Sequence, residues 1–149
     1  MAVVTVSYRG DLELARDLCL SMDRFLAEGA EHIPVVPRGD LALFEPLAGG
    51  RRRIVTVESV LPRGYMQLPA PRRIRIGPFD RRIREIWTGP GGVVRGWIIQ
   101  QILKLSAPSF TDRELIVFAD SDIVLVAPLS VDSLARRPGS PVPRSGRGG

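Results

Sequence analysis

Apolar residues recur along the chain in two patterns, short strand-like runs and longer stripes at helical spacing. The β-branched run Val3–Tyr8 precedes a polar R-G-D loop and predicts a buried strand. Asp11 then stands at an N-cap position, and the spacing predicts an amphipathic helix of about five turns that ends at Gly29. The apolar stripe of this helix consists of Ala15, Leu18, Cys19, Met22, Phe25 and Leu26. Cys19, the only cysteine, is therefore expected to be a small buried hydrophobe.

Two further strand-like runs follow the helix. His32–Pro37 contains Pro34, which cannot donate to a ladder and favours a short or edge strand. Arg53–Ser59 comes after the turn signal Gly49-Gly50. The alternation of strands and helices predicts an α/β fold, a mostly parallel sheet with right-handed crossovers flanked by helices.

The pattern fades over Leu61–Gly92, which is rich in arginine, proline and glycine and predicts an extended arm or a loop over the sheet edge. Helical order then resumes before Pro108. We expect the buried stripe of this helix to hold Val94, Ile98, Ile102 and Leu105. Its other face presents Trp97, Gln101 and Lys104.

The length of 149 residues fits one domain. We expect it to cover residues 1–134, with residues 135–149 a disordered tail rich in Pro, Gly and Arg. No run of about 18 apolar residues predicts a membrane span. The start of the sequence has no secretory-signal pattern, so the cytoplasm is the expected compartment.

The net charge of +5 is unevenly distributed. Residues 1–50 carry −4, residues 51–100 carry +8 and residues 101–149 carry +1. The middle third is therefore suited to phosphates or to peripheral contact with an anionic membrane surface. The basic clusters have no interleaved aromatics, which argues against a nucleic-acid partner. Lys104 is the only lysine in the chain, and it suits either a point-charge contact to a phosphate or a solvated helix face.

The stretch "ELIVFADSDIVLVAP" places Asp120 and Asp122 one residue apart after an apolar run that predicts a buried central strand. Side chains alternate along an extended backbone, so these two carboxylates share one side and Ser121 takes the other. They would lie at the carboxyl end of the strand, where open α/β sheets bind ligands. Oxygen-only ligation by carboxylates, water and phosphate suits Mg²⁺ or Mn²⁺. The other interpretation is a charged turn between two strands.

"VVTVSYRGD", "GWIIQQILKLSA" and "VFADSDIVLV" together resemble the nucleotide-sugar-binding half of GT-A glycosyltransferases, closest to a branch of unknown function. The resemblance covers roughly residues 2–130. It implies a Rossmann-like fold, a nucleotide-diphosphate sugar as ligand and a divalent cation, Mn²⁺ or Mg²⁺, held by the D-x-D carboxylates.

Particular residues take roles through this resemblance. Asp120 and Asp122 would be the metal pair, with Asp122 the direct ligand and Asp120 on the metal or the ribose. The residues that would line the nucleotide pocket are Ser7, Tyr8 and Arg9. Lys104 and Arg95 would add positive charge toward the departing diphosphate.

The chain departs from the resembled family, because only 27 residues follow Asp122 where that family continues into an acceptor-binding half. This predicts a truncated chain with an exposed sheet edge, open to self-association, and it leaves transfer activity uncertain. Two alternatives therefore stay open. One is a non-catalytic nucleotide-binding remnant. The other is a phosphatase of the haloacid-dehalogenase type, because "DSDIV" also resembles the nucleophile motif of those enzymes.

Overall fold

The computed structural model describes residues 1–68, 73–76, 79–82 and 86–135, with side chains in 1–68 and 86–135. The strands are β1 (Ala2–Val6), β2 (Glu31–Val36), β3 (Val55–Thr56), β4 (Met66–Leu68), β5 (Arg73–Ile76), β6 (Phe79–Arg82), β7 (Ile86–Gly89), β8 (Gly92–Val94) and β9 (Ile116–Phe118). The α-helices are α1 (Leu12–Phe25), α2 (Leu41–Phe44), α3 (Val57–Val60), α4 (Gly96–Leu105) and α5 (Val131–Ala135). Short 3₁₀ turns include η1 (Arg9–Asp11) and η2 (Arg38–Asp40).

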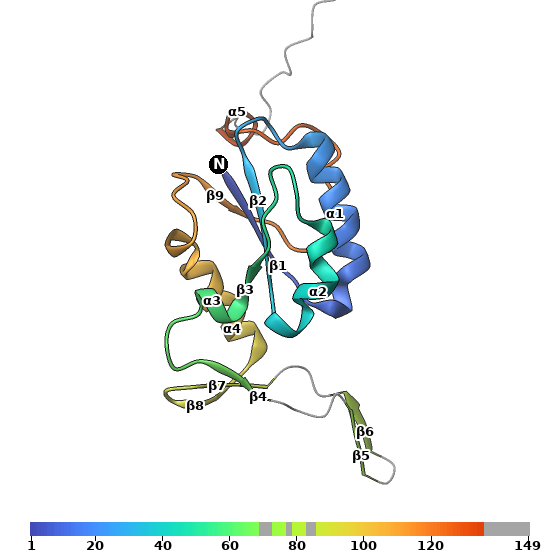
Figure 1. Cartoon of the computed structure of the whole chain (residues 1–149), viewed down its shortest axis with the longest axis vertical. Helices are drawn as coiled ribbons and strands as arrows, with labels where there is room; N and C mark the ends of the chain where they lie inside the picture. Colours follow the sequence, from blue (N-terminus) through green and yellow to red (C-terminus); the bar gives the residue numbers. More distant parts are fainter. Residues whose placement is uncertain (69–72, 77–78, 83–85, 136–149) are drawn as a thin grey trace, which may run out of the picture.

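A four-stranded parallel sheet forms the centre of the molecule (Figure 1), in the order β3-β2-β1-β9. β1 pairs with β2 from Ala2 opposite Glu31 onward, and with β9 from Ala2 opposite Ile116 onward. The α/β class and the parallel sheet flanked by helices are thus confirmed. The topology is compatible with a Rossmann-like fold.

Helices cover both faces of this sheet (Figure 1). Alternation along β1 sends Val3 toward α1, where it packs with Leu18 and Met22. Val4 faces the other side and packs in one cluster with Ile99 of α4. The core is therefore two apolar layers separated by the sheet.

The first predicted helix is confirmed as α1, with different ends. It spans 14 residues, about four turns, and ends at Phe25 because Leu26 already has an extended backbone. Gly29, with φ +76°, lies in the turn before β2. Asp11 occupies the N-cap position, but its side chain makes no capping hydrogen bond. Cys19 is buried, as expected.

The edge position suggested by Pro34 is wrong, because β2 lies between β1 and β3. His32 exchanges backbone hydrogen bonds with Arg51 and Arg53, and two residues later Pro34 faces the same side. Pairing with β3 resumes only at Val35. The missing N–H of Pro34 therefore falls in a gap between two short stretches of pairing.

The third strand is shorter than predicted. β3 contains two residues, and the chain turns into α3 at Val57. The arm expected over Leu61–Gly92 contains regular antiparallel structure instead: β4, β7 and β8 form a three-stranded sheet, and β5 pairs with β6. Trp87 of β7 is 1% exposed and belongs to the core that contains α4, so β7 packs against the parallel sheet.

Two expectations about the last elements are corrected. The buried face of α4 holds Ile99 and Leu103. Of the predicted stripe, Ile102 packs against the same core, Val94 also packs there but belongs to β8, and Leu105 is 82% exposed. β9 is an edge strand of the described sheet and not a central one, and its Phe118 is 41% exposed. The predicted self-association through a sheet edge thus has a candidate strand, and it stays a prediction.

The expected domain end at residue 134 lies within α5, and the tail predicted for residues 135–149 falls outside the described residues after Ala135. In the part of the chain that the structure describes, no helix combines the length and apolar character needed to cross a membrane.

Candidate functional site

The order of strands reverses at β1. The chain runs from β1 to β2 and β3 on one side and then returns to place β9 on the other side. In parallel sheets, ligands bind outside the carboxyl ends of the strands at such a reversal, where neighbouring loops diverge. The loop after β1 holds Ser7, Tyr8 and Arg9, and the loop after β9 holds Asp120 and Asp122. The predicted site residues from two distant parts of the sequence therefore flank one reversal point.

A hydrogen bond between side chains connects these two loops. Ser121 is 7% exposed, and its Oγ donates to Asp11 Oδ2 over 3.4 Å. Asp120 and Asp122 on either side of it are exposed. Ser121 is buried and the two carboxylates are exposed, but residues 121–122 form a turn beyond the end of β9 and not the extended backbone on which the alternation was predicted. The Asp11 carboxylate thus contacts the D-x-D turn and makes no capping hydrogen bond to α1.

The loop after β1 contains an unpartnered buried hydroxyl. Ser7 is 3% exposed, and its Oγ has no hydrogen-bond partner among the described residues, although its backbone N–H donates to Val35. A buried polar group normally finds a partner, so an unpaired one at a strand's carboxyl end is a candidate ligand contact. Beside it, the ring of Tyr8 lies over Gly10, where a Cβ would come within 2.8 Å of Tyr8 Oη. A larger residue there would displace the Tyr8 ring.

Arg9 is held by Asp40 of η2. Asp40 Oδ2 accepts from the Arg9 backbone N–H at 2.8 Å, Asp40 Oδ1 accepts from Arg9 Nε at 2.5 Å, and the guanidinium also reaches the Gly39 carbonyl. Asp40 is 4% exposed, so this ion pair is partly shielded from water. Most of the hydrogen-bonding capacity of Arg9 is used to fix the loop.

Lys104 is the predicted cation that the structure brings to the D-x-D turn. Its Nζ lies 3.7 Å from Asp120 Oδ1 and 5.7 Å from the centroid of the Phe118 ring. Asp120 is 77% exposed in its side chain, and a pair this open contributes at most about 1 kcal/mol. The ammonium is therefore easily redirected. Arg95 precedes α4 at its N-cap, is exposed, and makes no hydrogen bond or ion pair with the described residues of this turn.

The carboxylates of the turn can be tested against the metal that the resemblance implies. Across the described ranges, His, Cys, Asp and Glu side chains nowhere gather in threes that would hold a metal ion. Mg²⁺ and similar cations, however, are commonly held by one or two carboxylates, with water and substrate phosphates completing the shell. Asp120 and Asp122 supply two such hard donors, and the hydroxyl of Ser7 lies in the adjoining loop. The donor chemistry fits a cation that arrives with a phosphate ligand.

Residues 2–140 match the sequence profile described as Family of unknown function (DUF6492). The chain belongs to this family. No curated protein and no solved structure shows a significant match.

Sequence reasoning missed the residues that hold the site loops of this DUF6492 protein together. Asp40 binds the loop after β1, and Glu58 Oε2 accepts from the Arg38 N–H at 2.9 Å in the loop after β2. Together with the Ser121–Asp11 contact, these side-chain hydrogen bonds connect the loops that follow β9, β1, β2 and β3, which is the order of the strands in the sheet. A signal was present, since R-G-D-L occurs after two neighbouring strands, at residues 9–12 and 38–41.

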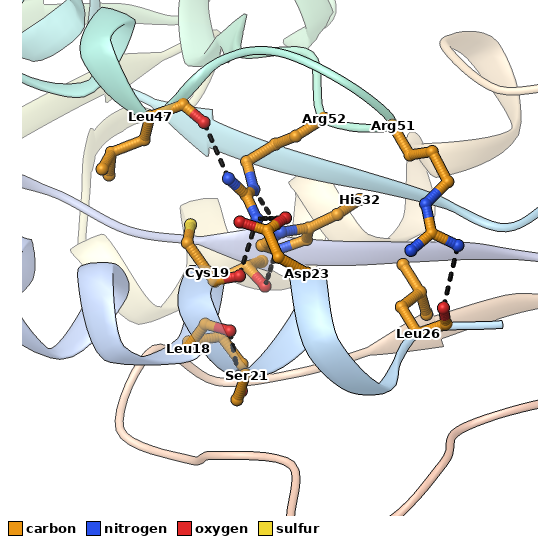
Figure 2. A network of polar contacts seen from close by, with 10 residues as sticks. Leu18, Cys19, Ser21, Asp23, Leu26, His32, Leu47, Arg51 and Arg52 are labelled. Atoms are coloured by element: carbon orange, nitrogen blue, oxygen red, sulfur yellow. Dashed lines mark hydrogen bonds and ion pairs between the residues drawn. The ribbon is translucent and has the colours of Figure 1, made fainter. Parts of the chain in front are cut away.

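A second polar cluster lies beneath α1, between β1 and β2 (Figure 2). His32 Nδ1 accepts from Arg52 Nε at 3.0 Å, so Nε2 carries the proton and donates to Thr5 Oγ1 at 3.1 Å. Burial, and then the neighbouring Arg52 charge, lower the pKa of His32 to about 3. Both ring nitrogens are satisfied, so this histidine is a neutral structural group of the core.

Arg52 connects the same cluster to α1. Its guanidinium donates to the carbonyls of Leu47 and Cys19 and pairs with Asp23 at 2.6 Å (Figure 2). Burial raises the pKa of the Cys19 thiol, which keeps it protonated and unreactive. The cluster fixes α1 against the sheet and is separate from the loops that carry the D-x-D turn.

Proposed function

We propose that this protein is glycosyltransferase-like: it binds a nucleotide-diphosphate sugar at the reversal point between β1 and β9 and transfers the sugar to an acceptor. The observation that carries the proposal is the convergence of two loops there, one with the buried, unpartnered Ser7 hydroxyl and one with the D-x-D carboxylates. The likeness of both stretches to GT-A enzymes supports it.

Asp120 and Asp122 would hold a divalent cation, Mn²⁺ or Mg²⁺, together with the diphosphate oxygens. When bound, this cation supplies Lewis-acid stabilisation of the charge that grows on the leaving nucleoside diphosphate. Asp122 has no side-chain partner among the described residues, whereas Asp120 faces Lys104. This difference favours Asp122 as the direct ligand.

The protein's own groups take the remaining roles. Ser7 Oγ donates to or accepts from the ligand, which satisfies a buried hydroxyl. Lys104 exchanges its open pairing with Asp120 for a diphosphate oxygen, a stronger charge-assisted contact. Tyr8 is 39% exposed and offers a ring face to the nucleotide. Arg9 lines the pocket mainly through its fixed backbone, because Asp40 holds its guanidinium.

Calorimetric titration with UDP and GDP, with and without Mn²⁺, tests the proposal. We expect binding that depends on the metal and that weakens more than about tenfold in Asp122→Asn. Asp17→Asn is the matched control, an exposed aspartate on α1 that should change nothing. A folded chain that binds neither nucleotide in Mn²⁺ would contradict the proposal.

A second assay distinguishes the reactions. Release of UDP from a UDP-sugar in the presence of acceptor extracts supports transfer, and binding without release supports the non-catalytic alternative. Cleavage of a generic phosphoester with Mg²⁺ alone would instead favour the phosphatase alternative.

A further inference from the structure

The amino end of the parallel sheet contains a hollow that none of the roles above uses. It has a volume of about 280 Å³, near the lower end of the range of small-ligand sites. We call it the arginine hollow. Its lining consists of Gly29, Ala30, Glu31, Gly50, Arg51, Arg52, Arg53 and Arg113. It shares Glu31, Arg53 and Arg113 with a wider hollow of about 580 Å³, which Asp112 also lines.

The charges around the arginine hollow do not balance. Four arginines face it, and the acidic residues along the two hollows are Glu31 and Asp112. Arg52 is not available to a ligand, since its side chain is 7% exposed and pairs with Asp23. Without the Arg52–Asp23 pair, the three remaining guanidinium groups still outnumber the two carboxylates, those of Glu31 and Asp112.

Arg51 is anchored and still has unused hydrogen-bonding capacity. Its Nη1 donates to the carbonyls of Leu26 at 2.8 Å and Ala27 at 2.5 Å. Figure 2 shows the bond to Leu26, which together with the bond to Ala27 anchors a side chain that lines the hollow. Nε and Nη2 have no partner among the described residues. An anchored guanidinium with free N–H groups suits an oxyanion, because little conformational entropy remains to be lost on binding.

Glu31 occupies the hollow as an internal anion. Its Oε1 accepts from the buried Thr111 hydroxyl at 2.5 Å, which holds the carboxylate in place. The arginines approach it less closely: Arg53 Nε is 3.4 Å from Oε2 and Arg113 Nε is 3.7 Å from Oε1. Both arginine side chains are about half exposed. Arg53 Nη2 also donates to the Phe110 carbonyl, which anchors that side chain, whereas its pairing with Glu31 and that of Arg113 are loose enough to be exchanged for a stronger anion.

We propose that the arginine hollow is a second binding site, specific for a phosphate group, in which Arg51, Arg53 and Arg113 bind the phosphate oxygens and Glu31 limits the affinity. Tetrahedral phosphate accepts several charge-assisted hydrogen bonds at once, whereas the Glu31 carboxylate already gives one oxygen to Thr111. The site needs no metal and lies at the end of the sheet opposite the D-x-D turn. It therefore stands independently of the proposed nucleotide site.

Titration with inorganic phosphate in EDTA tests this site, followed by nuclear magnetic resonance shifts of the backbone amides. We expect shifts at residues 29–31, 50–53 and 111–113. Arg113→Gln should weaken binding about tenfold, whereas Arg63→Gln, an exposed arginine before β4, should leave it unchanged. Glu31→Gln keeps an acceptor for Thr111 and removes the competing charge, so it should tighten binding several-fold. A variant that had simply lost its fold could not bind more tightly.

Two sources of the phosphate are separated by a second measurement. Co-sedimentation with phosphatidylcholine vesicles that contain phosphatidic acid, compared with phosphatidylcholine alone, identifies a lipid headgroup, and binding of phosphate only in solution identifies a small ligand. Binding of either kind supports the site if it is lost in Arg113→Gln. Absence of phosphate binding by the folded chain, or binding that Glu31→Gln and Arg113→Gln leave unchanged, overturns the proposal.

Discussion

Acid should destabilise this protein through His32. The ring is 2% exposed, and its pKa is lowered from 6.5 to about 3 in the folded protein. In the unfolded chain the imidazole takes up a proton as the pH falls through about 6.5, whereas the folded state excludes that proton until about pH 3. A depressed folded pKa therefore gives stability that is fully present above pH 6.5 and is lost as the pH falls toward 3.

The magnitude follows from the two pKa values. At about pH 5 the folded ring is still neutral, and the unfolded ring is about 1.5 units below its pKa. At about 1.4 kcal/mol per unit, His32 alone should lower the free energy of unfolding by about 2 kcal/mol between pH 7.5 and pH 5. Because the folded pKa lies well below 5, this figure depends little on its exact value.

Urea unfolding at about pH 7.5 and pH 5 measures this effect. Carboxylates also titrate in acid, so the comparison is with His32→Gln, which keeps a donor for Thr5 and an acceptor for Arg52 but carries no titratable proton. The wild-type protein should lose about 2 kcal/mol more than the variant over this interval. Equal losses in the two proteins would refute the reasoning, because they would mean that the ring is protonated in the folded state.

Other substitutions test the site loops and the core. Asp40→Ala leaves the Arg9 loop without its buried anchor and should cost about 2–3 kcal/mol in urea unfolding; a loss below about 0.5 kcal/mol would contradict the role of this pair. Phe44→Ala removes a fully buried ring of α2 and should cost about 3–5 kcal/mol in the same urea unfolding; a loss below about 1 kcal/mol would contradict its place in the core. Lys104→Gln should leave stability within about 0.5 kcal/mol and weaken UDP binding in Mn²⁺; unchanged affinity would exclude Lys104 from the diphosphate site.

Local patterns were enough to predict the first strand, the first helix and the class of sheet. The predicted strand is buried from Val3 to Thr5, although it ends at Val6 and Tyr8 is exposed, and the helical stripe through Leu18 and Met22 is buried as expected; both are set by short-range periodicity. The prediction from Pro34 was wrong, because the sequence shows that this residue has no N–H to donate but does not show that β2 and β3 are unpaired at this position. The exposure of Leu105 could likewise not be predicted from the sequence, since it depends on where α4 ends relative to the sheet.

The site was predictable only in part. The apolar run was enough to place Asp120 and Asp122 just after a strand, although they lie in a turn and not on extended backbone, and the structure places their loop next to that of Ser7. The anchors Asp40 and Glu58 could not be found this way, because their partners come from neighbouring strands that only the folded sheet brings together. The arginine hollow was hidden for the same reason: residues from three separate segments form it.

The location of the metal tests the central claim most directly. In an amide-resolved magnetic resonance spectrum of the protein with UDP, added Mn²⁺ broadens the signals of residues within its reach. The account predicts selective broadening in residues 7–11 and 119–123, the loops after β1 and β9, and its loss in Asp122→Asn. Broadening centred on any other part of the chain, or none in a folded protein, would contradict a metal-dependent nucleotide site at this reversal point.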